Sequence, residues 1–169
     1  MTNVESVSES ESEAIVREVW IAANPEDVFP YFTEADKLSI WKAAWAAADA
    51  RPGGGFRVDV TGRGDVAHGA YLEIEPPRRV VFTWEWQNED LADLYRGSVV
   101  EVTLAPEGGG TLLRLVHRGV PRDHRGRSAE GWTHYLSRLA VAAGGQDPGP
   151  DAWAAEPTPE ALIDRKAPR

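Results

Sequence analysis

Cysteine is absent from the 169-residue sequence. Disulfide bonds, thiolate metal sites and cysteine nucleophiles are therefore excluded. The start of the chain also lacks the basic stretch and apolar run that mark a secretory signal, because residues 1–13 are mainly Ser and Glu. No apolar run approaches the length that crosses a bilayer. We therefore expect a soluble, cytoplasmic protein without a membrane span.

Basic residues are also scarce. The 18 Lys and Arg are outnumbered by 27 Asp and Glu, which gives a formal net charge of −9. Binding to nucleic acid needs a surplus of basic side chains on one face, so nucleic acid is not an expected partner. A neutral or cationic small molecule fits this charge better, although acidic charge also serves solubility alone. High Arg and Ala with few Lys is typical of a GC-rich, bacterial genome.

Motifs for catalysis and metal binding are missing as well. There is no G-x-S-x-G and no Walker loop, and the G-x-G at Gly62–Gly64 falls in a turn between predicted strands. The histidines, His68, His117, His124 and His134, lack the spacing of zinc ligands. We therefore assign no cofactor, no metal ion and no catalytic residue, and favour a binding role over an enzymatic one.

Composition divides the chain into three parts. Residues 1–13 are expected to form a disordered acidic tail, because Ser and Glu bury too little apolar area to offset the entropy of ordering. Residues 14–144 are expected to form one domain. Residues 145–169 are a Gly/Pro-rich C-terminal tail in which Pro159–Lys166 is predicted to be a short helix. Trp153 in this tail is a candidate for docking on the domain.

The domain is predicted to open with a strand at residues 14–23 and two short helices. Asn24-Pro25 is a good helix start, and Pro30 is expected to stop the first helix after little more than a turn. The run Thr33-Glu34-Ala35-Asp36 matches a capping box for the second helix. The Ala-rich run that follows is expected to extend this helix to Ala50.

Beyond the glycines at 53–55 the hydrophobic period changes from helical to alternating, which predicts antiparallel strands. The run FRVDV alternates strictly between apolar and charged side chains. In the next strand, Ala70, Leu72 and Ile74 are expected to share one face. In the run VVFTWEWQ, the inward face is expected to carry Val80, Phe82, Trp84 and Trp86.

Two further strands, SVVEVTL and TLLRLVH, are predicted to pair through the turn APEGGG. If Leu104 lies opposite Thr111, the apolar residues of both strands share the inner face. The same register places Glu101 opposite Arg114 as an outward ion pair.

After Pro121 the period returns to 3.6. Trp132, Leu136, Leu139 and Ala143 fall on one stripe of a predicted helix that ends at Gly144-Gly145. The sheet has one apolar face and the helix one apolar stripe, so the two are expected to bury each other. The predicted fold class is α+β. It is a helix-grip fold, in which a curved antiparallel sheet of about six strands wraps around a long C-terminal helix, with two short helices after strand one.

Several runs within residues 14–143 resemble the activator of heat-shock-protein ATPase homologue-like (AHSA-like) family. They are NPEDVFPYFTEADKLSIWK, GGGFRVDV, GAYLEIEPPRRVVFTWEW, GGGTLLRLVHRGVP and EGWTHYLSRL. This family belongs to the START-type helix-grip superfamily (SRPBCC), and the resemblance implies its fold and a hydrophobic pocket between sheet and helix. Members often carry a second tryptophan directly after the one that matches Trp41, where this sequence has Lys42. The ligand of a relative is therefore not transferred to this chain.

The candidate binding site lies where tryptophans from distant segments are expected to converge. Large aromatic side chains fill cores, but they also line apolar cavities. His117 is expected to point inward at the end of its strand. The leading hypothesis is the binding of a small, largely apolar molecule in the cavity between sheet and long helix. The predicted ligand-binding residues are Trp41, Phe56, Trp84, Trp86, Val100, His117, Trp132 and Leu136.

Two alternatives stay open. One is a small-molecule enzyme of the cyclase, hydrolase or dehydratase type that uses His117 as a base. The other is a protein-interaction module that stimulates a chaperone ATPase, as the resemblance implies, or binds a regulator. A homodimer is compatible with each of these. An inward pair of titratable groups beside His117 would favour the enzyme, and a large exposed apolar patch outside the pocket would favour the interaction module.

Overall fold

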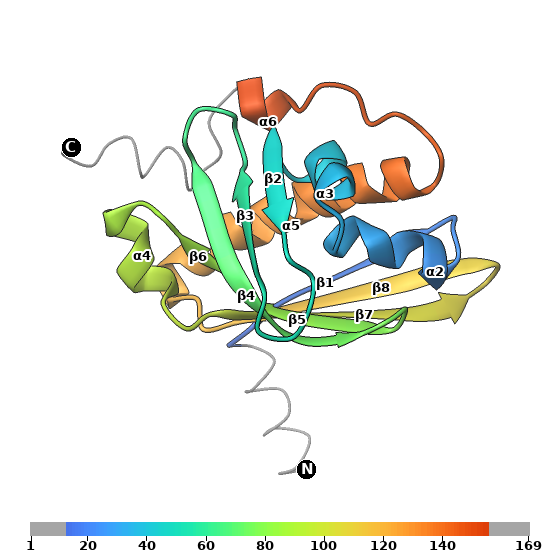
Figure 1. The fold of residues 1–169 in the computed structure, drawn as a ribbon, viewed down its shortest axis with the longest axis horizontal. Coiled ribbons are helices and arrows are strands. Elements are labelled where there is room, and N and C mark those ends of the chain that lie inside the picture. Colours follow the sequence, from blue (N-terminus) through green and yellow to red (C-terminus); the bar gives the residue numbers. More distant parts are fainter. Residues whose placement is uncertain (1–12, 156–169) are drawn as a thin grey trace, which may run out of the picture.

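The computed structural model describes residues 13–155, which form an α+β fold in which an antiparallel sheet curves around one long helix (Figure 1). Within these residues, no helix has both the length and the apolar character to span a membrane. The strands are β1 (Ile15–Ile21), β2 (Trp45–Ala48), β3 (Gly55–Asp59), β4 (Val66–Glu75), β5 (Arg79–Thr83), β6 (Glu85–Trp86), β7 (Val99–Glu107) and β8 (Gly110–Arg118). The helices are α2 (Pro25–Val28), the 3₁₀ helix η1 (Phe29–Phe32), α3 (Ala35–Trp41), α4 (Glu89–Tyr95), α5 (Arg122–Ala143) and α6 (Ala152–Ala155).

The sheet confirms the predicted helix-grip fold, with eight strands where about six were expected. Its order is β1-β8-β7-β5-β4-β3-β2, and the short β6 pairs with β4 off this path. One additional strand, β6, is the end of the predicted run VVFTWEWQ, which is interrupted at Trp84. The Trp84 N–H donates to the carbonyl oxygen of Ser98 at 3.1 Å, so the interruption leaves this backbone group hydrogen-bonded.

The second additional strand, β2, replaces the predicted helix extension to Ala50, which is wrong. α3 ends at Trp41, and β2 pairs antiparallel with β3. Alanine favours helix over strand by intrinsic propensity. The pairing nevertheless prevails, because β2 satisfies the backbone groups that β3 would otherwise leave open at the edge of the sheet.

The first helix after β1 begins where predicted, but the second does not. Pro25 is the first residue of α2, which ends at Val28, and Pro30 lies within the 3₁₀ helix η1. The predicted capping box is wrong, since the N-cap of α3 is Glu34 rather than Thr33 and its side chain makes no capping bond. These short elements deliver the Phe32 and Trp41 rings to the core, where their centroids lie 5.3 Å apart.

A β-bulge in β4 changes which side chains face inward. The register against β5 shifts between Tyr71 and Glu73. Tyr71 is consequently buried and Leu72 is 48% exposed, so the expected shared face of Ala70, Leu72 and Ile74 is wrong. The bulge brings the Tyr71 ring into the interior.

The β7–β8 hairpin is present, but its predicted register is wrong by two residues. The strands continue to a two-residue turn at Gly108–Gly109, whose φ angles of 56° and 80° are accessible to glycine at little cost. Leu104 therefore lies opposite Leu113 instead of Thr111. A shift of two residues keeps the apolar side chains on the inner face, which is why the predicted burial holds.

The change of register moves the outward ion pairs. Glu101 lies opposite Val116 instead of Arg114, and it accepts a hydrogen bond from Arg79 Nε at 3.0 Å. Arg114 lies 3.8 Å from a carboxylate oxygen of Glu18 on the neighbouring strand β1. The predicted cross-strand pair is thus replaced by contacts to the strands on either side of the hairpin.

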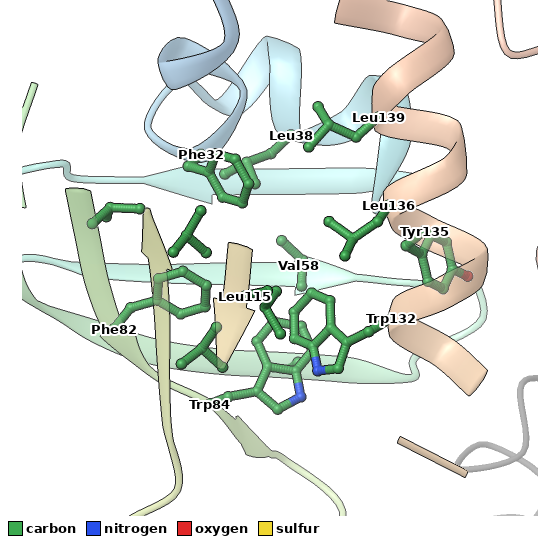
Figure 2. Packing of buried hydrophobic residues seen from close by; sticks show 14 of the residues in the cluster. Phe32, Leu38, Val58, Phe82, Trp84, Leu115, Trp132, Tyr135, Leu136 and Leu139 are labelled. Atoms are coloured by element: carbon green, nitrogen blue, oxygen red, sulfur yellow. The ribbon is translucent and has the colours of Figure 1, made fainter. Parts of the chain in front are cut away.

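The long helix closes the core as predicted. α5 buries Trp132, Tyr135, Leu136 and Leu139, and Figure 2 shows Trp132, Leu136 and Leu139 extending toward the sheet. A further helix, α4, lies between β6 and β7 and did not emerge from the sequence patterns. Its N-cap Asn88 accepts a hydrogen bond from the backbone N–H of Asp90 through its side chain.

After α5 the chain turns back over the domain. Residues 144–155, which we call the C-terminal strap, end in α6, and Trp153 stacks on the His134 ring of α5 with centroids 4.3 Å apart. His134 Nε2 lies 2.7 Å from Asp151 Oδ1. Trp153, a candidate for docking on the domain, therefore packs on α5. The predicted helix at Pro159–Lys166 and residues 1–12 of the predicted acidic tail lie outside the described residues.

Candidate functional site

Two small cavities lie between the sheet and α5. Cavity 1 and cavity 2 each have a volume of about 20 Å³, which is room for about one water molecule. Lys42, Trp84 and Trp132 line both, so these three side chains separate them. Cavity 1 is also lined by Phe32, Leu38, Trp41, Phe56, Val58, Tyr71 and Phe82, and cavity 2 by Val60, Trp86, His117, Ser128, Gly131 and Tyr135.

Lys42 is an unusual residue for such an interior. It directly follows α3 and is only 6% exposed. Its ammonium nitrogen lies 4.1 Å from the ring centroid of Tyr135, 4.6 Å from that of Trp132 and 4.8 Å from that of Trp84. The electron-rich faces of aromatic rings attract a cation at such distances. The three rings therefore form an aromatic cage around the Lys42 ammonium.

The aromatic side chains of the site pack at steep angles rather than in one stack. The centroid of Trp84 lies 5.5 Å from that of Trp132 and 5.7 Å from that of Trp86. Figure 2 shows Trp84, from the sheet, beside Trp132, from α5. At cavity 1, the Tyr71 hydroxyl donates to the carbonyl oxygen of Phe32 at 2.8 Å, and burial raises the pKa of Tyr71. The tyrosine therefore stays neutral and hydrogen-bonded.

His117 points into the interior, as predicted, and is 1% exposed. Its Nδ1 accepts a hydrogen bond from Trp132 Nε1 at 3.1 Å, and its Nε2 lies 3.0 Å from the Ser98 hydroxyl oxygen, which in turn donates to the carbonyl oxygen of Trp84. Because an indole nitrogen can only donate, the imidazole proton must be on Nε2. Burial, reinforced by the charge of Lys42, lowers the pKa of His117 to about 3. The ring is therefore neutral near pH 7.

Trp86 brings a buried hydrogen-bond donor to cavity 2. Its side chain is 6% exposed, and its Nε1 has no hydrogen-bond partner among residues 13–155. The Ser128 hydroxyl, by contrast, is bonded to the Tyr95 hydroxyl. A buried N–H without a partner destabilises the fold by roughly 1–3 kcal/mol. An acceptor atom placed at Trp86 would remove that penalty.

Most of the predicted ligand-binding residues line one of the two cavities, namely Trp41, Phe56, Trp84, Trp86, His117 and Trp132. Val100 and Leu136 are buried in the core and line neither of them. Trp41 is 2% exposed, and its Nε1 donates to the carbonyl oxygen of Tyr31 at 2.9 Å, so it forms a fixed wall. The one enclosed cavity expected from the sequence is thus divided in two.

The sequence analysis did not assign Lys42 or Tyr71 to the site. A signal for Lys42 was available, because it stands where family members often carry a second tryptophan. The structure shows that this position is buried. Tyr71 had no such signal, since the β-bulge that turns it inward is not visible in the alternation of the strand.

A third cavity lies under the C-terminal strap. Cavity 3 has a volume of about 280 Å³ and is lined by strap residues together with Trp41 and Val60. Trp41 also lines cavity 1 and Val60 also lines cavity 2, so single side chains separate cavity 3 from the inner pair. Arg138 of α5 donates to the carbonyl oxygens of Trp41 at 3.3 Å and Pro148 at 3.4 Å, which ties the strap to the end of α3.

Comparison with known proteins places this site in a family context. Residues 22–144 match the family described as Activator of Hsp90 ATPase homolog 1-like protein. Human Activator of 90 kDa heat shock protein ATPase homolog 1 is 26% identical over 113 residues, which are 66% of this chain and 31% of the human protein. The chain therefore spans about a third of the length of this curated relative.

Solved structures show the same fold. The AHSA1-like protein of Rhizobium etli is 39% identical, with a TM-score of 0.65 over 83% of this chain and 87% of that one. The Aha1 dimer from Colwellia psychrerythraea is 18% identical, with a TM-score of 0.68 over 78% of this chain and 98% of that one. At that identity the second likeness concerns the fold alone.

Proposed function

Because this chain belongs to the family of Activator of Hsp90 ATPase homolog 1-like proteins, as its sequence runs predicted, we propose that it binds a small, largely apolar molecule between the sheet and α5. The observation that carries the proposal is that Lys42, Trp84 and Trp132 line both inner cavities. A lysine side chain is long and flexible. Its withdrawal from the aromatic cage, together with a shift of the Trp84 and Trp132 rings, would join cavity 1 and cavity 2 into one chamber.

The described conformation is a closed form of the proposed site. Small-molecule sites typically have volumes of roughly 300–1,000 Å³, whereas each inner cavity has about 20 Å³. Binding therefore requires side chains to move, and a ligand would select a more open minor conformation. Trp41 and Val60 separate cavity 3 from the inner cavities, so cavity 3 becomes continuous with the site only if these side chains also move.

The surroundings of His117 favour binding over catalysis. Both of its ring nitrogens are engaged within the protein, with Trp132 and Ser98. A general base needs a free nitrogen within reach of the substrate and a pKa near the working pH. A pKa of about 3 makes His117 a weak base. The enzyme hypothesis based on His117 therefore has little support, and the histidine is better explained as part of the wall.

Two measurements test the proposal. Native mass spectrometry of the purified protein is expected to show a retained small molecule. A neutral apolar probe, N-phenyl-1-naphthylamine, is expected to raise the melting temperature by mass action and to change tryptophan fluorescence. Trp132→Leu should weaken binding of the probe, whereas Trp20→Leu, at a residue that is 47% exposed, should leave it unchanged. Absence of both a retained molecule and probe binding would reject the proposal.

A second candidate function is stimulation of a chaperone ATPase. The observation that favours it is that the human and mouse relatives are both described as activators of the 90 kDa heat shock protein ATPase. The test is to add the purified protein to a 90 kDa heat shock protein from the same source and measure its ATP hydrolysis. An unchanged hydrolysis rate at saturating protein would reject this function without affecting the ligand-binding proposal.

A further inference from the structure

A hydrogen-bond donor without a partner belongs to the lining of cavity 2. The Trp86 side chain lines this cavity and is 6% exposed, and its indole Nε1 is buried with no hydrogen-bond partner among the described residues. Buried polar groups in proteins are usually hydrogen-bonded, so an exception calls for an explanation. An indole N–H can donate a hydrogen bond and cannot accept one. An acceptor atom brought by a ligand would therefore complete the bonding of Trp86.

Other polar groups of cavity 2 are already engaged within the protein. Both ring nitrogens of His117 have partners, one of which is the indole of Trp132. The Ser128 hydroxyl is bonded to the hydroxyl of Tyr95. Lys42 interacts with the rings of the aromatic cage. An acceptor that enters cavity 2 therefore finds its partner at the indole N–H of β6.

We propose that the ligand is an apolar molecule with an uncharged carbonyl oxygen, as in a ketone, an ester or an amide, which accepts a hydrogen bond from Trp86 in cavity 2. This inference rests on the proposed ligand-binding function. A pure hydrocarbon would leave the buried N–H unpaired, whereas a carbonyl oxygen satisfies it. An alcohol would bring a proton that also needs an acceptor, and both nitrogens of His117 are taken. Since the indole is a neutral donor, an uncharged oxygen satisfies it without the cost of burying a charge.

Cavity 1 receives the apolar body of the ligand. Its lining is largely aromatic and aliphatic, and two of its hydrogen-bond donors are already bonded within the protein. The Tyr71 hydroxyl donates to the carbonyl oxygen of Phe32 at 2.8 Å, and Trp41 Nε1 donates to that of Tyr31 at 2.9 Å. An apolar body gains from burial against such walls in proportion to the apolar area removed from water. The apolar body therefore lies toward α3, and the carbonyl oxygen lies toward Trp86 and β6.

2-Acetonaphthone and 2-ethylnaphthalene form a matched pair of probes, because they share a ring system and differ only in a carbonyl in place of a methylene group. Their affinities for the full chain are measured by isothermal titration calorimetry. The two probes differ in hydration, so the binding of each to the wild type is compared with its own binding to Trp86→Phe, which lacks the indole N–H and keeps an aromatic ring. This variant should bind the ketone on the order of fivefold more weakly and the hydrocarbon as well as the wild type does. Trp20→Phe alters an exposed indole that donates to the Glu107 carbonyl oxygen, and it should leave both affinities unchanged.

Proton–nitrogen NMR of the labelled wild type reports on the same hydrogen bond without a substitution. A hydrogen bond deshields the donated proton, so the Trp86 indole resonance should lie at a higher proton frequency in the ketone complex than in the hydrocarbon complex. The Trp20 indole resonance should be the same in both complexes. This measurement decides the matter if circular dichroism shows that Trp86→Phe does not fold.

The outcomes separate this inference from the proposed function. An equal effect of Trp86→Phe on the two probes, or the same Trp86 resonance in the two complexes, would overturn carbonyl recognition while ligand binding stands. 2-Naphthoate carries a charged acceptor on the same ring system and should bind more weakly than the ketone, so tighter binding would overturn the uncharged class. Binding of none of these probes would overturn the proposed function itself.

Discussion

Acidification tests the interior position of His117 directly. The ring is 1% exposed, and a hydrogen bond from Trp132 occupies the nitrogen that a second proton would need. The pKa of His117 is therefore about 3 in the folded protein, against an ordinary value of 6.5. Unfolding releases a group that binds a proton much more readily. The free energy of unfolding must consequently depend on pH through this side chain.

The sign and size follow from proton linkage. Above the ordinary pKa of 6.5, the imidazole is neutral in both states and the full stability is present. As the pH falls from 6.5 toward the folded pKa of about 3, only the unfolded state takes up the proton, so stability is lost. Between about pH 7 and about pH 5 the loss is about 2 kcal/mol. This figure hardly changes if the folded pKa is anywhere below about 4, because the unfolded state fixes it.

The assay is urea denaturation of the wild type and of His117→Gln at both pH values. The free energy of unfolding of the wild type should fall by about 2 kcal/mol more than that of the variant, whose amide does not titrate. Proton NMR of the imidazole should show no titration of His117 over the same range. An equal pH dependence in the two proteins would refute the reasoning, because it would mean that the folded ring accepts a proton despite Trp132.

Three further predictions concern the stability of the domain. Trp84→Ala should lower the free energy of unfolding by about 3–5 kcal/mol in chemical denaturation, because a buried indole is lost, and a smaller change would mean that the site collapses around the gap. Arg114→Glu should cost about 1 kcal/mol or less, because its contact with Glu18 is largely exposed, whereas global unfolding would mean that the outward face of the sheet is misassigned. Burial alone would raise the pKa of Asp151, but hydrogen bonds, first that from His134, lower it. Asp151→Asn should therefore destabilise the protein near pH 7, and the difference from the wild type should shrink as the pH falls through the folded pKa, a trend that thermal unfolding across pH would show or exclude.

Hydrophobic periodicity was sufficient to predict the fold because each long element has one buried face. The alternating apolar residues of β3 and β8 and the 3.6-residue stripe of α5 each give the element one apolar face, which the sequence shows directly. β2 could not be found in this way. Its alanines prefer a helix, and the advantage of the strand arises only from the backbone of β3.

The register of two paired strands, and the side of the sheet on which a side chain lies, depend on backbone geometry that a hydrophobic pattern does not show. Three successive glycines, Gly108 to Gly110, permit more than one hairpin turn, and the two with positive φ determine the pairing of β7 with β8. The β4 bulge likewise reverses the alternation around Tyr71 without a distinctive residue type. The convergence of Trp84, Trp86 and Trp132 was predictable, because the alternation of the run VVFTWEWQ and the 3.6-residue stripe of α5 place all three on buried faces.

Position 42 shows how a departure from the family pattern leads to a site and to a decisive variant. Lys42→Trp restores the residue type that relatives often carry there, and the indole would occupy the space now shared by the lysine side chain and the adjoining cavities. The larger indole would fill the space that a ligand needs when Lys42 leaves the aromatic cage. We therefore expect a folded protein, by circular dichroism, that no longer binds N-phenyl-1-naphthylamine. If this variant binds the probe as the wild type does, the ligand occupies another part of the molecule, and the chamber around Lys42 is only a feature of the core.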